Sequence, residues 1–170
     1  STPPAGTFTQ VSAGHSHNCA LRSDGSLTCF GLSTDGQSTP PAGTFTQVSA
    51  GGLHTCAVKT DGTLDCFGDN DDGQSPPSPL QGNTASRAQV GAGTQHSCAV
   101  KTDGAVECWG RDEGGPGTPA STMFSQVSVG VGHTCGVTTT GSVVCWGGNN
   151  VYGQATPPAG TFTQVSAGGL

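Results

Sequence analysis

The stretch His54–Gly68, HTCAVKTDGTLDCFG, decides how this chain folds. Three further versions begin at His17, His96 and His133, and every version holds two cysteines ten positions apart. Between them a second stretch, TPPAGTFTQVSAG, stands at 2–14, 39–51 and 156–168. One valine marks each unit, at Val11, Val48, Val90, Val127 and Val165, so successive units lie 37, 42, 37 and 38 residues apart. A period of this length is typical of repeat proteins, whose units bury their apolar faces by stacking.

Each version of the stretch predicts a β-hairpin. In the first unit we expect strands over 7–13, 17–22 and 26–30, with a turn at 23–25 whose glycine supplies the positive φ. The same turn recurs at Asp61-Gly62, Asp103-Gly104 and Thr140-Gly141. A three-residue turn places Leu21 opposite Leu27 and Cys19 opposite Cys29. Opposed residues of an antiparallel pair lie within the reach of a disulfide bond.

The cysteines predict a disulfide in every unit. The expected pairs are Cys19–Cys29, Cys56–Cys66, Cys98–Cys108 and Cys135–Cys145. An even count at regular spacing favours an oxidising compartment, so we expect an extracellular or cell-surface location. Zinc is the alternative, but structural zinc sites favour closer pairs such as C-x2-C.

Both faces of the hairpin are apolar. One face carries the disulfide with Leu21 and Leu27, and the other carries alanine or glycine with an aromatic residue after the second cysteine. A sheet that is buried on both faces fits a blade between two other blades, and the sequence therefore predicts an all-β protein of tandem β-propeller blades. We place the units at 1–38, 39–75, 76–117, 118–155 and, as a partial unit, 156–170. The third unit departs from the others, with a longer connection at 76–88 and a different loop ending at 114–117.

Composition excludes two classes of function. Lysine and arginine total 5 in 170 residues and the net charge is −6, which argues against binding nucleic acid through its phosphates. No apolar run approaches the roughly 18 residues of a membrane-spanning helix.

The motif G-x-x-H-t-C-a-v-x-x-D-G-x-x-x-C-W-G-x-N-x-x-G-Q resembles the regulator of chromosome condensation repeat, also called the alpha-tubulin suppressor repeat. The short period resembles the bacterial secreted branch, which includes a beta-lactamase inhibitory protein. The resemblance implies a seven-bladed propeller that binds proteins. Because the chain holds about four and a half units, we expect either part of a longer array or units that stack openly without closing a ring.

The recurring polar and aromatic residues are candidates for structural roles. We expect His17, His54, His96 and His133 to bond neighbouring backbone, with metal binding as the alternative, and Trp109 and Trp146 to be structural. Asp69, Asp71 and Asp72 weakly resemble a calcium loop but lack its full spacing and its final glutamate. No nucleophile–base set or carboxylate pair stands out, so we expect neither an enzyme nor a cofactor.

The sequence leaves three functions open. The first is a secreted, non-enzymatic scaffold that binds protein partners through loops at one rim of the propeller. The second is a self-associating subunit of an extracellular filament or surface layer, with O-linked glycans on its Thr/Ser- and Pro-rich connections. The third is an enzyme inhibitor or a lectin-like propeller. Few aromatic residues fall in the loops, where Tyr152 and Met123 stand out, so a tight inhibitory surface has little support.

Overall fold

The computed structural model describes residues 4–76, 86–111, 118–119, 121–148 and 150–168. They form four three-stranded antiparallel sheets in consecutive order, and no described residue is helical. Blade 1 is β1 (Phe8–Ala13), β2 (His17–Arg22) and β3 (Leu27–Gly31). Blade 2 is β4 (Phe45–Ala50), β5 (His54–Lys59) and β6 (Leu64–Gly68). Blade 3 is β7 (Arg87–Ala92), β8 (His96–Lys101) and β9 (Val106–Gly110), and blade 4 is β10 (Phe124–Val129), β11 (Thr134–Thr138) and β12 (Val143–Trp146).

The register within each blade follows from the short turn between its second and third strands. In blade 1 the Arg22 amide donates to the Ser26 carbonyl at 2.8 Å, and Gly25 takes a φ of 85°. Leu21 then pairs with Leu27. Blades 2, 3 and 4 repeat this pairing, and the predicted all-β tandem repeat is thereby confirmed.

The same register places the two cysteines of each blade opposite one another. The bonds are Cys19–Cys29, Cys56–Cys66, Cys98–Cys108 and Cys135–Cys145, with Cα atoms 4.0 to 4.1 Å apart. The first cysteine of each pair is buried, and Cys19, Cys56 and Cys98 lie in the apolar clusters between blades. No described cysteine is free. Each bond closes a short loop of the unfolded chain, which stabilises a blade whose own core is small.

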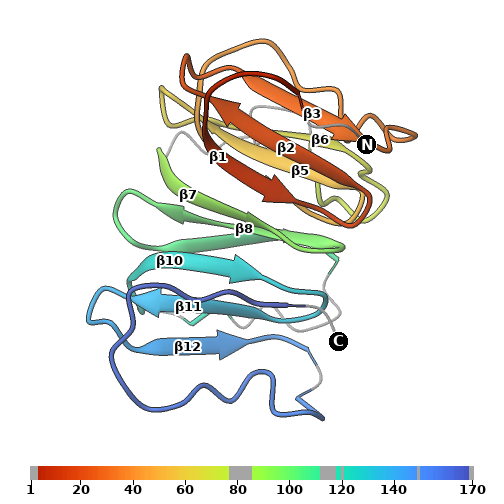
Figure 1. Ribbon diagram of the computed structural model, residues 1–170. Helices are drawn as coiled ribbons and strands as arrows, with labels where there is room; N and C mark the ends of the chain where they lie inside the picture. The colour runs from red at the N-terminus through yellow and green to blue at the C-terminus, as the bar shows by residue number, and fades with distance from the viewer. Residues whose placement is uncertain (1–3, 77–85, 112–117, 120, 149, 169–170) are drawn as a thin grey trace.

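The blades stack face to face to form an open part of a propeller (Figure 1). The first strands of neighbouring blades contact one another, β1 with β4, β4 with β7, and β7 with β10. The second strand of each blade also packs on the first strand of the next. We call the three contacts between blades seam 1, seam 2 and seam 3, in chain order.

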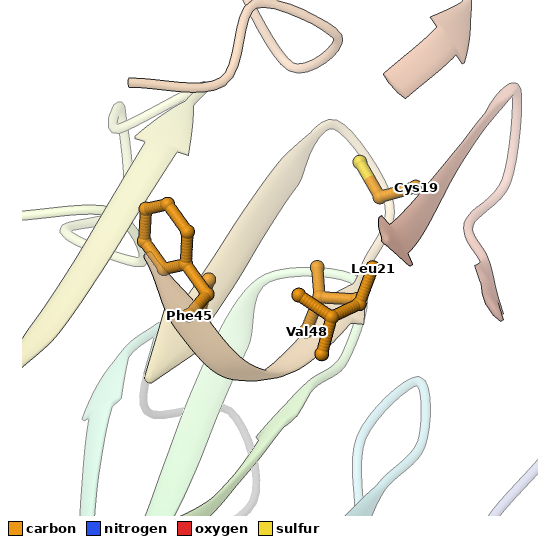
Figure 2. Close-up of a cluster of buried hydrophobic side chains, with 5 residues drawn as sticks. Cys19, Leu21, Phe45 and Val48 are labelled. Atoms are coloured by element: carbon orange, nitrogen blue, oxygen red, sulfur yellow. The ribbon is translucent and has the colours of Figure 1, made fainter. Parts of the chain in front are cut away.

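Each seam contains an apolar cluster. In seam 1, Cys19 and Leu21 of β2 pack on Phe45 and Val48 of β4 and on Ala57 of β5, as Figure 2 shows for the labelled side chains. Seams 2 and 3 repeat this arrangement. Both faces of blades 2 and 3 are buried against neighbouring blades. This explains why the repeat has apolar residues on both faces of its strands.

The limits of the units given above stay a prediction. Much of the long connection at 76–88, and the loop at 114–117, lie outside the described residues. Within the described part of the chain, no helix has the length and apolar character needed to cross a membrane.

Candidate interaction surface

The stacked blades have two edges with different loops. The loop rim holds the turns between first and second strands and the loops that follow third strands. Hydrogen bonds tie these two kinds of loop together in blades 1 to 3, from Leu32 N to Ser16 O, from Asp69 N to Leu53 O and from Arg111 N to Gln95 O, each 2.9 Å. The loop rim lies toward the right of Figure 1, the side to which the arrows of β10 and β12 point. The turn rim, at the opposite edge, holds the turns between second and third strands.

A glutamine on each first strand joins its blade to the next. The Gln10 side chain donates to the Val48 carbonyl and accepts from the Val48 amide, both at 3.0 Å. The amide group therefore makes the two hydrogen bonds that an adjacent strand would make. The same pair of hydrogen bonds joins Gln47 to Val90, Gln89 to Val127, and Gln126 to Val165 of the fifth unit.

In blades 1 to 3 a histidine at the start of the second strand also reaches the next blade. His17 Nε2 lies 2.7 Å from the Thr55 hydroxyl, which itself donates to the Gln37 carbonyl at 3.1 Å. Because the single hydroxyl proton goes to that carbonyl, the hydroxyl accepts from Nε2–H, and the ring is the Nε2-protonated tautomer. His54 contacts Ser97 at 2.7 Å and His96 contacts Thr134 at 3.0 Å. The partner is thus a hydroxyl of the next blade, and not the backbone that we expected.

Burial keeps these imidazoles neutral. It lowers the pKa values of His17 and His96, and it lowers the pKa of His54 to about 4. The carboxylate of Asp69 opposes the shift at His54, and the neighbouring histidines add to it. The Nδ1 atoms of His17 and His54 are buried without a hydrogen-bond partner, so a proton taken up there would remain unpaired in the seam.

Glycines allow the first strands to approach closely at the loop rim. A Cβ on Gly14, Gly51 or Gly93 would collide with the carbonyl oxygen of the equivalent glycine one blade further on. On Gly14 and Gly51 it would also meet the histidine ring of the same blade. The repeated glycine is therefore required by the contact between blades.

The acidic loop at Asp69–Gly73 is closed by hydrogen bonds of its own. The Asp69 carboxylate accepts from Gln74 Nε2 at 2.8 Å and from Asp71 N at 3.0 Å, and Asp72 accepts from Gln95 Nε2 at 3.0 Å. Among the described residues no group of three His, Cys, Asp or Glu side chains could hold a metal ion. The geometry gives no support to the weak resemblance to a calcium loop.

The two tryptophans lie at the seams. Trp109 Nε1 donates to the Gln74 carbonyl at 3.0 Å, which joins blade 3 to the loop of blade 2. The Trp146 ring lies 5.3 Å from the Phe124 ring, centroid to centroid, and packs on the cluster of seam 3. The structural role of the two tryptophans stays a prediction.

Large apolar side chains are exposed mainly at the loop rim. Of the seven described, five lie there: Leu32 (41%), Leu53 (38%), Val131 (41%), Val151 (66%) and Tyr152 (81%). Met123 lies at the turn rim, and Val11 lies on the outer face of β1. Sequence reasoning singled out Tyr152 and Met123 but missed the others, because a lone leucine or valine in a glycine-rich turn gives no periodic signal.

A shallow hollow of about 250 Å³ lies at the C-terminal ends of the first strands. Its lining is mostly glycine and alanine from the four blades and the fifth unit, together with His15, Thr94, Val129 and Val131. Since these residues include the turns after β1, β4, β7 and β10, the hollow belongs to the loop rim.

The family model of the regulator of chromosome condensation (RCC1) repeat matches residues 8–37, 45–74, 88–115 and 124–154, which is more than half of the chain. The four matched stretches coincide with the four blades. No curated protein matches the chain by sequence.

Solved structures share the fold. The ectodomain of the receptor kinase CR4 from Physcomitrella patens is 24% identical with a TM-score of 0.76, over 95% of this chain and 45% of that one. The CRINKLY WD40 ectodomain of ACR4 from Arabidopsis thaliana is 30% identical with a TM-score of 0.66, over 82% of this chain and 49% of that one. Prp20p from Saccharomyces cerevisiae, described with its binding to Gsp1p and histones, is 18% identical with a TM-score of 0.77, over 93% and 49%. This chain spans about half the length of these structures.

Proposed function

Because the chain belongs to the family of regulator of chromosome condensation (RCC1) repeats, we propose that it is a non-enzymatic scaffold that binds protein partners through its loop rim. One observation carries the choice of rim: five of the seven exposed large apolar side chains of the described residues lie there. Exposed apolar side chains gathered at one edge are typical of protein interaction sites. Propellers of this family are generally protein-interaction scaffolds, and Prp20p is described with two protein partners.

The proposed location is extracellular. Four disulfides persist most readily in an oxidising compartment, and two of the similar structures are ectodomains of receptor kinases. Expression in a eukaryotic secretory pathway therefore suits the experiments below, because it forms disulfides and attaches N-linked glycans.

A glycan placed on either rim tests which one binds. The substitution Asp72→Ser completes an N-x-S acceptor for a glycan on Asn70, at the loop rim. The substitution Asp61→Asn completes an N-x-T acceptor with Thr63, at the turn rim. Asn70 and Asp61 are both exposed. The parent chain and each variant are used to capture proteins from the extracellular fluid of the organism to which the protein is native. The captured proteins are quantified by mass spectrometry.

We expect the glycan at Asn70 to abolish capture of proteins that the parent chain retains, and the glycan at position 61 to leave their capture unchanged. Equal capture by both variants, or loss of capture with the turn-rim glycan alone, would contradict the proposal. Thermal unfolding of the two glycosylated variants checks that both are folded.

Self-association into a filament or surface layer is the second candidate. The observation that favours it is the outer face of β1, where Val11 is 69% exposed although its equivalents Val48, Val90 and Val127 are 1% exposed. Electron microscopy of the native material tests it: fibres with a regular axial repeat would favour this candidate, and separate particles would favour the scaffold.

A further inference from the structure

We propose that the loop rim recognises a basic protein surface, on which lysine or arginine side chains stand beside apolar ones. This inference rests on the proposed function and adds the chemistry of the partner. It is drawn from the distribution of charge between the two rims, from the position of the apolar side chains among the acids, and from the hollow.

The loop rim is acidic. Its described charged residues are Asp35, Asp69, Asp71 and Asp72, against the single cation Arg111. The turn rim is nearly balanced: its described cations are Arg22, Lys59, Arg87 and Lys101, and its acids are Asp24, Asp61, Asp65, Asp103 and Glu107. A surface of one sign attracts and orients partners of the opposite sign.

The charge of the loop rim is not cancelled by ion pairs between described residues. Those pairs, Lys59–Asp65, Arg87–Glu107 and Lys101–Glu107, all lie at the turn rim. At the loop rim Asp69 and Asp72 accept from the neutral amides of Gln74 and Gln95. These hydrogen bonds hold the carboxylates in place and leave their negative charge available to a partner.

Exposed apolar side chains lie in or beside the acidic loops of blades 1 and 2. Leu32 begins the loop that carries Asp35, and the Leu53 carbonyl accepts from the Asp69 amide at 2.9 Å. On blade 4 the loop carries Val151 and Tyr152. Stable protein interfaces combine apolar and aromatic contacts at their centre with charged groups around them. The loop rim offers both kinds of group to a partner that is basic and partly apolar.

The size of the hollow favours a protein partner over a small molecule. Its volume of about 250 Å³ is below the 300–1,000 Å³ of typical small-molecule pockets. A single long side chain projecting from a partner surface would fit in it. The glycine and alanine lining offers backbone and methyl groups and few polar side chains, which suits the aliphatic part of a lysine, arginine or leucine.

Two synthetic peptides test the chemistry. One holds lysine and leucine in a fixed irregular order, and the other has glutamate in place of every lysine. We expect fluorescence anisotropy to show that the parent chain binds the lysine peptide at least about tenfold more tightly, with an affinity that falls as salt is added. Equal affinity for the two peptides would overturn the proposal.

Matched variants, made in the bacterial periplasm to avoid glycans, test the location. The loop-rim variant combines Asp35→Asn, Asp71→Asn and Asp72→Asn, and the turn-rim variant combines Asp24→Asn, Asp61→Asn and Asp103→Asn. Both lose three negative charges, and asparagine keeps the side-chain oxygen that accepts hydrogen bonds in such turns. We expect the loop-rim variant to lose about tenfold in affinity for the lysine peptide and the turn-rim variant to lose less than about twofold. Equal losses would overturn the proposal.

The glycan experiment separates the two levels of inference. If the glycan at Asn70 blocks protein capture but the lysine peptide is not preferred, the scaffold function holds and the basic partner is wrong. If the glycan has no effect on capture, the proposed function itself fails.

Discussion

Seam 2 and seam 3 share the glutamine contact and a contact from a histidine to a hydroxyl, but they differ at a pair of positions beside them. In seam 2 the Ser49 hydroxyl accepts from the Ala92 amide at 2.9 Å. In seam 3 Gly91 stands where Ser49 would, and Val129 stands where Ala92 would. A Cβ on Gly91 would lie only 3.0 Å from Val129 Cγ2.

The difference shows that one position of the seam can be filled in two ways. Seam 2 uses a polar pair of serine and alanine, and seam 3 uses an apolar pair of glycine and a larger valine. Seam 1 also has the polar pair, since Ser12 accepts from the Ala50 amide. Each of the three seams has one such glutamine, Gln10 in seam 1, Gln47 in seam 2 and Gln89 in seam 3. The glutamine contact is therefore common to all three seams. The residue at the serine position changes together with its neighbour in the next blade.

The largest expected effect comes from a contact that all seams share. In Gly51→Ala the new methyl group would collide with the Gly93 carbonyl oxygen, which is backbone and cannot rotate away. We expect a loss of more than about 4 kcal/mol in the free energy of unfolding, or no folded protein. Secreted yield and guanidinium denaturation measure it.

Gly132→Ala is the matched control for that substitution. Gly132 lies in a turn of the same rim, and a Cβ there would have no atom within 4 Å. We expect the control to change stability by less than about 0.5 kcal/mol. A Gly51→Ala protein as stable as the control would show that the blades can separate at this rim without cost.

Acidification is expected to weaken the seams through their histidines. The pKa of His54 is about 4 in the folded protein against 6.5 as its ordinary value, so the unfolded chain takes up a proton first as the pH falls. Folded stability should therefore fall between pH 6.5 and pH 4, by about 3 kcal/mol for this residue. Guanidinium denaturation at a series of pH values measures the fall.

The variant His54→Gln is the control for the pH effect, because its side chain does not titrate. We expect its stability to be lower than that of the parent chain at pH 7.5 and to fall less between pH 6.5 and pH 4. His17 and His96, whose pKa values burial also lowers, should contribute to the remaining fall. An unchanged pH dependence in the variant would rule out His54 as its source.

The sequence predicts the fold well because each blade is determined by local signals. The turn at Asp24-Gly25 sets the register, and the register places Cys19 opposite Cys29 and Leu21 opposite Leu27. The seams are harder to predict. His17 and its partner Thr55 are 38 residues apart, and only the stacking of two blades brings them together.

The sequence suggested binding through loops at one rim, but it could not show which apolar side chains that rim exposes. Leu32, Leu53 and Val131 occupy different loops with no common spacing, and their exposure depends on how the blades are stacked. The sequence did identify the acidic residues Asp69, Asp71 and Asp72, but only as a weak resemblance to a calcium loop. It does not show that Gln74 and Gln95 donate hydrogen bonds to the carboxylates of Asp69 and Asp72.

A double-mutant cycle tests the paired difference between seams 2 and 3. Gly91→Ser alone should destabilise the protein by about 1–3 kcal/mol, because its Cβ crowds Val129. Adding Val129→Ala reproduces the serine–alanine pair of seam 2 and should recover most of that loss. Additive effects of the two substitutions, measured as free energies of unfolding, would show that the pair is not coupled.

The smallest expected effect concerns the hydrogen bond that the next blade donates to the backbone carbonyl of the loop glutamine, Gln37 or Gln74. In seam 1 the Gln37 carbonyl accepts from the Thr55 hydroxyl, and in seam 2 the Gln74 carbonyl accepts from Trp109 Nε1. Blade 2 has Phe67 at the position of Trp109. Trp109→Phe should therefore cost about 1 kcal/mol, the net value of one hydrogen bond, together with a small loss of packing.

Phe67→Trp is the reciprocal control, because the hydroxyl of Thr55 already satisfies the carbonyl that an indole at position 67 would reach. We expect it to give no gain in stability. Denaturation midpoints of the two variants against the parent chain measure both changes. A gain from Phe67→Trp equal to the loss from Trp109→Phe would mean that ring size, and not the hydrogen bond to the loop carbonyl, accounts for the effect, and the two seams would then be equivalent at this position.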